Sequence, residues 1–227
     1  AEIDVNPLLI EDGRPVAADA LVILGKPSQP RRRLDFQPDL DAILRPRSVA
    51  IVGASDDTDK WGGSALRNIL DGGFDGAVYP VNPKGGEFFG LPVYASIDDL
   101  PEAPDLALLA VGGRQVVPMV EACGRRGIRA AIAIAAGFSE TGEEGAAAEQ
   151  ELAQLAADNH VSLIGPNCMG LISNEHSLHA LGFIVLHPIK GKLSIMSQSG
   201  NLGVQIVHAC QRRGIGIRKF VSVGNEA

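Results

Sequence analysis

The run Ser48–Gly63 constrains this chain more than any other stretch of its sequence. An apolar β-branched segment ends in a glycine-bearing turn, and the helical pattern Ser64–Leu70 follows. In an open parallel sheet this order presents backbone N–H groups and a helix N-terminus to a phosphate. The turn lacks the G-x-G-x-x-G spacing of dinucleotide-binding proteins, because Gly53 is followed by Ala54 and Ser55. It predicts either a cradle for a different nucleotide-type ligand or an ordinary strand-to-helix turn with no ligand.

The rest of the chain predicts an α/β fold. Hydrophobic residues make up 45% of the sequence and aromatic residues only 4%, and 27 residues are glycine. This composition suits parallel strands covered by helices on both faces, and an alternating order of strands and helices predicts right-handed crossovers in a Rossmann-like domain. We expect strands near Ser48–Gly53, Ala77–Val81, Leu106–Val111, Ala130–Ile134 and Ser162–Ile164. We expect helices near Gly63–Leu70, Val116–Arg126 and Glu143–Asn159.

Charge and cysteine usage narrow the class of protein. The net charge of −7 gives no broad footprint for nucleic acid, and we assign the basic triplet Arg31–Arg33 to a solvated linker. No apolar run is long enough to span a membrane and no signal pattern stands at the N-terminus, so we expect a cytoplasmic protein without a membrane partner. The three scattered cysteines suggest neither a disulfide framework nor a zinc site, which fits a reducing compartment.

The first residues predict a β-hairpin. Ala1–Ile10 has the pattern of a strand, Glu11–Pro15 that of a turn, and Val16–Leu24 that of a return strand. A two-stranded hairpin is marginal by itself, so we expect it to pack on structure outside this sequence. A linker rich in proline and charge follows, and then one short amphipathic helix over Asp39–Leu44.

Several loops should meet at the carboxyl ends of the predicted parallel strands, where ligands of open α/β sheets bind. The second strand runs into Asn82-Pro83-Lys84, whereas a nicotinamide-binding protein would usually have an acidic residue there. A lysine in a glycine-bounded loop favours a phosphate, which points toward a phosphorylated ribose such as that of coenzyme A. The loops at Ala135-Ala136-Gly137 and Asn167-Cys168 end the later strands. Cys168 has the alternative of being a small buried hydrophobe.

A second α/β unit begins after a connection over residues 173–191. Lys192–Met196 predicts a strand, Val204–Arg213 a helix and Ile217–Val223 another strand. The turn between the first strand and the helix, Ser197–Gly203, again presents hydroxyl groups and a helix N-terminus to an anion. Because the sequence stops at Ala227 with this unit incomplete, we expect a fragment.

Four motifs in this order resemble the NDP-forming acyl-CoA synthetase superfamily, which includes succinyl-CoA synthetase and ADP-forming acetyl-CoA synthetase. The motifs are Arg45–Ser55, Val81–Lys84, Ile164–Cys168 and Ser197–Gly200. The resemblance implies five segments: an ATP-grasp hairpin over 1–24, a linker over 25–38, a CoA-binding domain over 39–172, the connection over 173–191 and the start of a flavodoxin-like ligase domain over 192–227.

In that family ATP and a carboxylate give an acyl phosphate, a histidine carries the phosphoryl group, and CoA accepts the acyl group. By resemblance the cofactors are coenzyme A and ATP or GTP with Mg²⁺, the partner is a small carboxylic acid, and the assembly is a homo-oligomer. The residues implied for CoA are Gly53, Ala54, Ser55, Asn82, Pro83, Lys84, Ala135, Ala136, Gly137, Asn167 and Cys168. The amides of Ser199, Gly200 and Asn201 would receive the phosphoryl group, and Asn6 and Asp19 would help hold magnesium.

The sequence departs from the pattern of this family at some positions, and two other functions stay open. Ala136 stands where succinyl-CoA synthetase has a glutamate, which favours the acetyl-type branch. None of the five histidines matches the phosphohistidine motif, so we expect that catalytic residue beyond Ala227 and none within this chain. Asn6 and Asp19 could instead be a turn former and a surface charge. A CoA-sensing module, such as one fused to a protein acetyltransferase, is the alternative function, and a nicotinamide-dependent dehydrogenase is a third.

Overall fold

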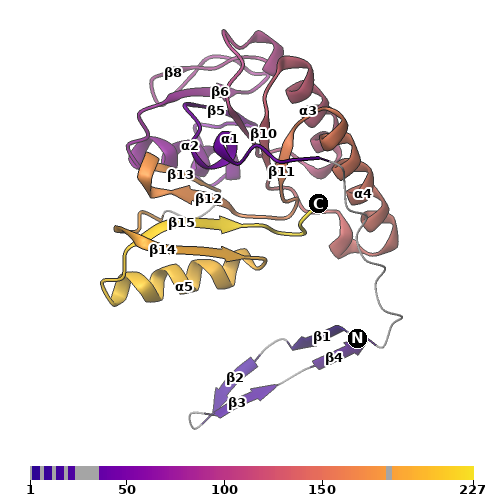
Figure 1. Cartoon of the computed structure of the whole chain (residues 1–227), viewed down its shortest axis with the longest axis vertical. Helices are drawn as coiled ribbons and strands as arrows, with labels where there is room; N and C mark the ends of the chain where they lie inside the picture. Colours follow the sequence, from indigo (N-terminus) through magenta and orange to yellow (C-terminus); the bar gives the residue numbers. More distant parts are fainter. Residues whose placement is uncertain (1, 6–7, 12–13, 18–19, 24–35, 183–185) are drawn as a thin grey trace. The chain divides into compact units, whose positions relative to one another are not determined.

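The chain forms two compact units, Ala1–Leu34 and Asp35–Ala227. A computed structural model describes residues 2–5, 8–11, 14–17, 20–23, 36–182 and 186–227. In the first unit, β1 (Glu2–Val5) pairs antiparallel with β4 (Ala20–Ile23), and β2 (Leu8–Glu11) pairs with β3 (Arg14–Ala17). These strands form the expected hairpin (Figure 1). The proposed magnesium ligands, Asn6 and Asp19, lie outside the described residues, as does most of the expected linker.

The second unit contains the predicted parallel sheet. Its strands lie in the order β11-β10-β9-β5-β6, and every neighbouring pair is parallel. The strands are β5 (Ser48–Val52), β6 (Ala77–Val81), β9 (Leu106–Leu109), β10 (Ala130–Ala133) and β11 (Ser162–Ile164). All five occur where the apolar runs predicted them. The expected α/β, Rossmann-like fold is therefore confirmed.

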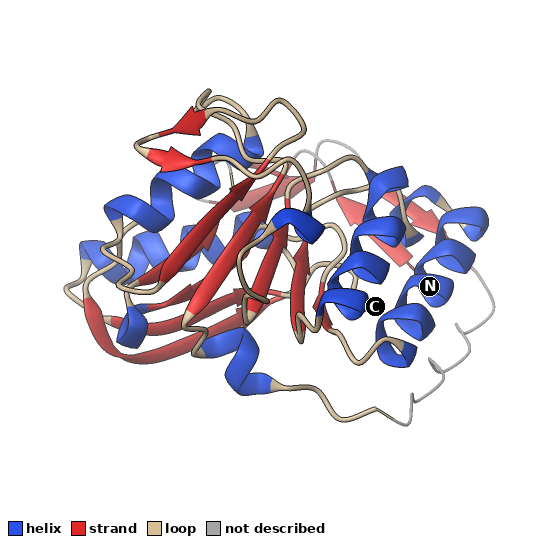
Figure 2. Cartoon of the chain, turned by 90° about the horizontal axis from the view of Figure 1, so that it is seen from above, coloured by secondary structure: helices blue, strands red, loops and turns tan. Residues whose placement is uncertain are grey.

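Helices cover both faces of this sheet, as Figure 2 shows. On one face α3 (Gly113–Arg126) and α4 (Glu143–Asp158) bury apolar residues against the strands. On the other face lie α2 (Trp61–Asp71) and the short α1 (Leu40–Leu44). Strands β5 and β9 are buried at every position, which is why they are continuous apolar runs without alternation.

A second sheet packs under the α2 face, with the strand order β13-β12-β15-β14. Its strands are β12 (Gly170–Ser173), β13 (Leu178–Leu181), β14 (Lys190–Ser197) and β15 (Ile217–Ser222). Helix α5 (Gly200–Arg212) covers its other face, against Phe220 and Ile172. The pairing of β14 with β15 is parallel, as the predicted crossover requires.

The sequence did not predict strands β12 and β13. We expected a connection over 173–191, and the structure places β13 and a 3-10 turn (Asn174–His176) within that range. Alternation explains the two strands: Leu171 and Ala180 face the parallel sheet, whereas Ile172 and Leu181 face α5. The antiparallel pair β12–β13 therefore joins the two cores.

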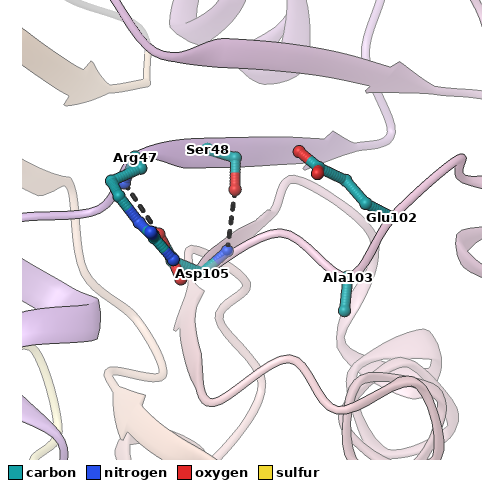
Figure 3. A pocket seen from close by; sticks show the side chains of 5 residues that line it. All are labelled: Arg47, Ser48, Glu102, Ala103 and Asp105. Carbon is teal, nitrogen blue, oxygen red and sulfur yellow. Dashed lines mark hydrogen bonds and ion pairs between the residues drawn. The ribbon is translucent and has the colours of Figure 1, made fainter.

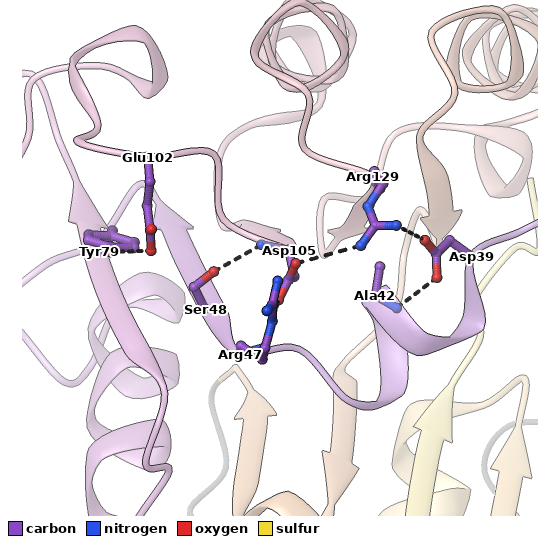
Figure 4. A network of polar contacts seen from close by, with 8 residues as sticks. All are labelled: Asp39, Ala42, Arg47, Ser48, Tyr79, Glu102, Asp105 and Arg129. Atoms are coloured by element: carbon purple, nitrogen blue, oxygen red, sulfur yellow. Dashed lines mark hydrogen bonds and ion pairs between the residues drawn. The ribbon is translucent and has the colours of Figure 1, made fainter.

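A polar network fixes the amino-terminal ends of the parallel strands (Figure 4). Asp105 lies at its centre: one carboxylate oxygen accepts from the Arg47 amide at 2.8 Å, and the Asp105 amide donates to Ser48 Oγ at 3.1 Å. Arg129 pairs with Asp39, the N-cap of α1, at 2.7 Å. These bonds hold the start of β5, β9 and β10 and the short helix together, so this end of the sheet is structural.

The described part of the chain has three further small features. A short hairpin follows β6, made of β7 (Glu87–Phe88) and β8 (Leu91–Pro92). Two more 3-10 turns lie at Ile97–Asp99 and Ser139–Thr141. Among the described residues, no helix combines the length and the apolar character that crossing a bilayer requires.

Candidate functional site

The loops singled out in the sequence all follow the carboxyl ends of parallel strands. Reading across the sheet, they are the loops after β6, β5, β9, β10 and β11. Because all five strands are parallel, these loops lie along one edge. With neighbouring strands about 4.8 Å apart, the edge from β6 to β11 is about 19 Å long. The sequence-predicted residues therefore form a row suited to an elongated ligand.

The loops after β5 and β6 are joined by hydrogen bonds. The amides of Gly53 and Ala54 donate to Val81 O at 2.9 and 3.2 Å. Asn82 Nδ2 donates to Ala54 O at 2.8 Å, and Asn82 Oδ1 accepts from the Lys84 amide at 2.9 Å. The Asn82 side chain is thus committed to shaping both loops. In a nicotinamide-binding protein an acidic residue at this position would bind the ribose, whereas here Asn82 bonds to the two loops.

Close backbone approach explains two glycines of the opening motif. Gly53 has φ +83°, and a Cβ atom there would lie 2.3 Å from Ala110 O. A Cβ atom at Gly62 would lie 2.0 Å from Gly53 O. Any larger residue at either position would push the loop away from β9 or from α2. The glycine spacing of this turn is therefore set by packing of the helix start against the loop.

The loops after β5 and β6 each have a lysine nearby, and the two lysines differ in whether they form an ion pair. Lys84 is exposed and forms no ion pair with another described residue. Lys60, at the start of α2, pairs with Asp57 at 3.2 Å. The Asp59 backbone amide, assisted by Lys60, lowers the pKa of Asp57, so this carboxylate stays ionised within its own loop. Of the lysines in these two loops, Lys84 is therefore the one whose side chain remains available for a ligand anion.

The loops after β10 and β11 are also joined. The Asn167 amide donates to Ala135 O at 2.8 Å, and a Cβ atom at Gly113 would lie 2.8 Å from Ala136 O, which brings the β9 loop to the same place. Ala136, Gly137 and Asn167 are exposed. This end of the row therefore has small side chains and an exposed carboxamide.

Cys168 points into the core and away from this edge. It is only 4% exposed, and its Sγ donates to Ala133 O at 3.3 Å. Burial raises the pKa of the Cys168 thiol to about 12, so it is neither a nucleophile nor a charged ligand at neutral pH. The structure thus supports the buried-hydrophobe alternative for its side chain, and any contact with a ligand here would involve its backbone.

The turn after β14 forms the N-terminus of α5. Ser199 is the N-cap, and its Oγ accepts from the Leu202 amide at 3.2 Å, while Ser197 Oγ donates to Ser199 O at 2.7 Å. These bonds engage the Leu202 amide, so the amides of Gly200 and Asn201 are among those that a helix N-terminus presents outward. The predicted phosphate-binding residues are therefore together at one helix end.

The two sheets meet at Met169. Its amide donates to Ser222 Oγ at 3.1 Å, at the carboxyl end of β15. A Cβ atom at Gly200 would lie 2.4 Å from Met169 Cγ, so the N-terminus of α5 contacts the residue that follows Cys168. The row of loops thus ends, after β11, beside the N-terminus of α5. Sequence reasoning missed Met169 and Ser222, because neither carries a recognisable motif.

A depression in the described part of the chain lies at the other end of the sheet (Figure 3). It measures about 250 Å³ and is lined by Arg47, Ser48, Glu102, Ala103 and Asp105. Its polar groups bond to one another, and Glu102 accepts from the Tyr79 hydroxyl at 2.6 Å, which raises the pKa of Tyr79 to about 12. This depression is therefore part of the structural network at the amino-terminal ends of the strands and not the ligand site.

Within the described residues, no group of three or more His, Cys, Asp or Glu side chains is arranged to hold a metal ion.

Comparison with known proteins identifies the larger domain. Residues 47–174 match the CoA binding domain family, and this range is more than half of the chain. The chain belongs to the CoA binding domain family. Residues 190–227 match a second family, the succinyl-CoA ligase like flavodoxin domain. The resemblance inferred from the four motifs is confirmed at this level.

Relatives of this CoA-binding chain are named as ADP-forming ligases. Acetate–CoA ligase [ADP-forming] I of Archaeoglobus fulgidus is 40% identical over 83% of this chain and 27% of its own length. Acetate–CoA ligase [ADP-forming] II of the same organism is 34% identical over 99% of this chain and 33% of its own length. A solved structure, the acetyl-coenzyme A synthetase 1 of Ca. Korarchaeum cryptofilum in complex with phosphate and ADP, superimposes with a TM-score of 0.79 at 36% identity, covering 83% of this chain and 40% of that one. This chain therefore spans about a quarter to two-fifths of the relatives' lengths.

Proposed function

We propose that this chain supplies the CoA-binding and phosphoryl-receiving parts of an NDP-forming acyl-CoA synthetase. The reaction is ATP, a carboxylate and CoA giving acyl-CoA, ADP and phosphate, through an acyl phosphate and a phosphohistidine. The observation that carries the proposal is the contact at Met169, where the row of loops proposed to bind CoA adjoins the N-terminus of α5. Acyl transfer to CoA requires a phosphoryl site and a thiol site to be neighbours, because positioning supplies much of the catalysis.

The order of loops along the edge assigns parts of CoA to residues. The 3′-phosphorylated nucleotide would bind over β5 and β6, at Gly53, Ala54, Ser55, Asn82, Pro83 and Lys84. The pantetheine arm would pass Ala135, Ala136 and Gly137, and the thiol would reach Asn167 and the backbone of Cys168. Small residues along this path allow close approach by a long, thin group. The exposed Lys84 would neutralise a phosphate.

The second site would hold the phosphoryl group. The amides of Ser199, Gly200 and Asn201 belong to the start of a 13-residue helix, where aligned N–H groups favour an anion. In this proposal the helix stabilises the acyl phosphate beside the thiol, and CoA attack on the acyl carbon releases phosphate to the same amides.

The N-terminal hairpin would be the closing segment of an ATP-grasp domain. Support comes from the second Archaeoglobus fulgidus ligase, which aligns over 99% of this chain and hence over the hairpin too. Asn6 and Asp19 would then contribute oxygen ligands to the Mg²⁺ of bound ATP or GTP. Ala136 favours the acetyl-type branch of the family over succinate as substrate. Three buried free cysteines fit a cytoplasmic location.

Calorimetric titration of the chain tests the proposal. We expect CoA to bind, dephospho-CoA to bind more weakly, and NAD not to bind. Added inorganic phosphate should shift the NMR signals of the Ser199–Asn201 amides and leave those of the α3 start unchanged. Binding of NAD in preference to CoA would contradict the proposal.

A further inference from the structure

The turn after β15 reaches back to the first sheet. The Asn225 amide donates to Pro166 O at 2.9 Å, and the Ala227 amide donates to Gly165 O at 3.0 Å. A Cβ atom at Gly224 would lie 2.2 Å from Pro166 O, so the two backbones pack directly. The carboxyl end of the second sheet is therefore fastened to the loop that follows β11.

The Asn225 side chain extends this connection. Its Oδ1 accepts from Asn167 Nδ2 at 3.2 Å, and its Nδ2 donates to Glu149 Oε2 at 2.8 Å and to Glu140 Oε2. Two carboxylates thus converge on one NH₂ group, which fixes the orientation of the carboxamide. Glu149 lies on α4 and is only 5% exposed.

The same two carboxylates hold the loop after β10. Glu140 Oε1 accepts from the amides of Gly137 and Phe138, and Glu149 Oε2 accepts from the Ser139 amide at 3.2 Å. Three consecutive backbone amides therefore donate to carboxylates that Asn225 bridges. Burial raises the pKa of Glu140, but the Gly137 amide and Asn225 outweigh burial and lower it below its usual value.

We propose that Asn225 is a positioning residue that sets the shape of the Ala135–Gly137 loop through Glu140 and Glu149. The inference rests on the proposed function only for the identity of the ligand that this loop borders. Asn225 donates to both anions and so allows them to lie close together. Through it the second sheet determines where the pantetheine arm can pass.

The variant Asn225→Asp tests the inference, because it replaces the shared donor by a third carboxylate. We expect CoA affinity to fall at least 10-fold, while the affinity for 3′-phospho-ADP, which lacks the pantetheine arm, changes less than 2-fold. The double variant Asn225→Asp, Glu140→Gln restores a donor between these two positions, and we expect it to recover most of the lost affinity. Gln154→Glu, which adds the same charge on an exposed part of α4, is the matched control and should change neither affinity.

Hydrogen exchange of the Gly137, Phe138 and Ser139 amides, measured without ligand, separates this inference from the proposed function. Faster exchange in Asn225→Asp supports the positioning role even if the wild-type chain binds no CoA. Unchanged exchange, or equal loss of affinity for CoA and 3′-phospho-ADP, would overturn it. If Asn225→Asp does not fold, Asn225→Ala decides with the same readouts, because it removes the donor without adding charge.

Discussion

Single residues on the ligand edge have unequal roles, and Lys84 differs from its neighbours. Asn82, Gly53 and Ala54 bond to one another or to the strands, so they shape the edge. Lys84 uses its amide for this purpose, while its side chain is exposed. A ligand phosphate would thus find its charge partner at Lys84.

Replacement of this lysine should therefore separate two closely related ligands. If Lys84 neutralises the 3′-phosphate, Lys84→Ala should weaken CoA by about 1–3 kcal/mol more than dephospho-CoA, as expected for a charge-assisted contact. Calorimetry of both ligands measures the difference. Lys192→Ala, on the exposed strand β14, serves as the control and should leave both affinities unchanged. Equal losses for the two ligands at Lys84→Ala would place the lysine elsewhere.

At the scale of elements, the turn between β5 and α2 depends on glycine packing. Gly62→Ala would place a methyl group 2.0 Å from Gly53 O, which is backbone and cannot rotate away. We expect a loss of about 1–3 kcal/mol in the free energy of unfolding, as is typical of overpacking. Denaturant unfolding measures it. Gly112→Ala is the control, since its added methyl group would lie 3.9 Å from Gln115 Oε1. Equal stability of the two variants would refute the packing explanation.

Strand β13 carries a buried histidine whose proton positions follow from its neighbours. Asn174 Nδ2 donates to Pro188 O and Ile217 O, so Asn174 Oδ1 must accept from His179 Nε2 at 2.8 Å. His179 Nδ1 is then unprotonated and accepts from His187 Nδ1 at 2.6 Å. With His187 in this tautomer, protonating His179 would place two N–H groups face to face.

This arrangement predicts a pH dependence of stability. Burial, with the nearby His187 and Lys190, lowers the pKa of His179 from 6.5 to about 4. Between pH 6.5 and about pH 4 the unfolded chain therefore binds more protons than the folded chain. The stabilisation that neutral His179 gives to the folded state is complete above about pH 6.5 and is lost as the pH falls toward 4. In His179→Gln the stability difference between pH 7 and pH 4 should shrink by about 2–3 kcal/mol. Urea unfolding at several pH values measures this difference. The control variant His160→Gln, which replaces an exposed histidine, should keep the full pH dependence. If the stability of His179→Gln changes with pH in parallel with the wild type, His179 does not cause the pH dependence.

Strands that are continuous apolar runs were predictable from the sequence. Strands β5, β6, β9, β10 and β11 are short apolar runs, and a glycine follows the end of each of them within four residues. Strands β12 and β13 were not predicted, because their buried positions include the polar residues Ser173 and His179, which break the apolar pattern. Ser173 Oγ donates to Leu44 O from a distant part of the chain, and His179 bonds to Asn174 and His187 through contacts that no sequence motif marks.

At the scale of the whole larger unit, the important feature is that the loop after β11 of the first sheet contacts Ser222 and the N-terminus of α5 in the second. The loops of the candidate site could be listed from the sequence, because parallel strands place their carboxyl ends together. The junction at Met169 and the bridge at Asn225 could not, since each depends on how the second sheet packs on the first. The direction of the Cys168 side chain likewise depends on the core around it.

The structure of the larger unit with bound CoA tests this arrangement most directly. We expect the 3′-phosphate within hydrogen-bonding distance of Lys84 Nζ, the pantetheine arm along the loops after β9 and β10, and the sulfur atom between Asn167 and the N-terminus of α5. A CoA molecule bound at the amino-terminal ends of the strands, near Arg47 and Asp105, or one whose sulfur atom points away from Gly200, would contradict it.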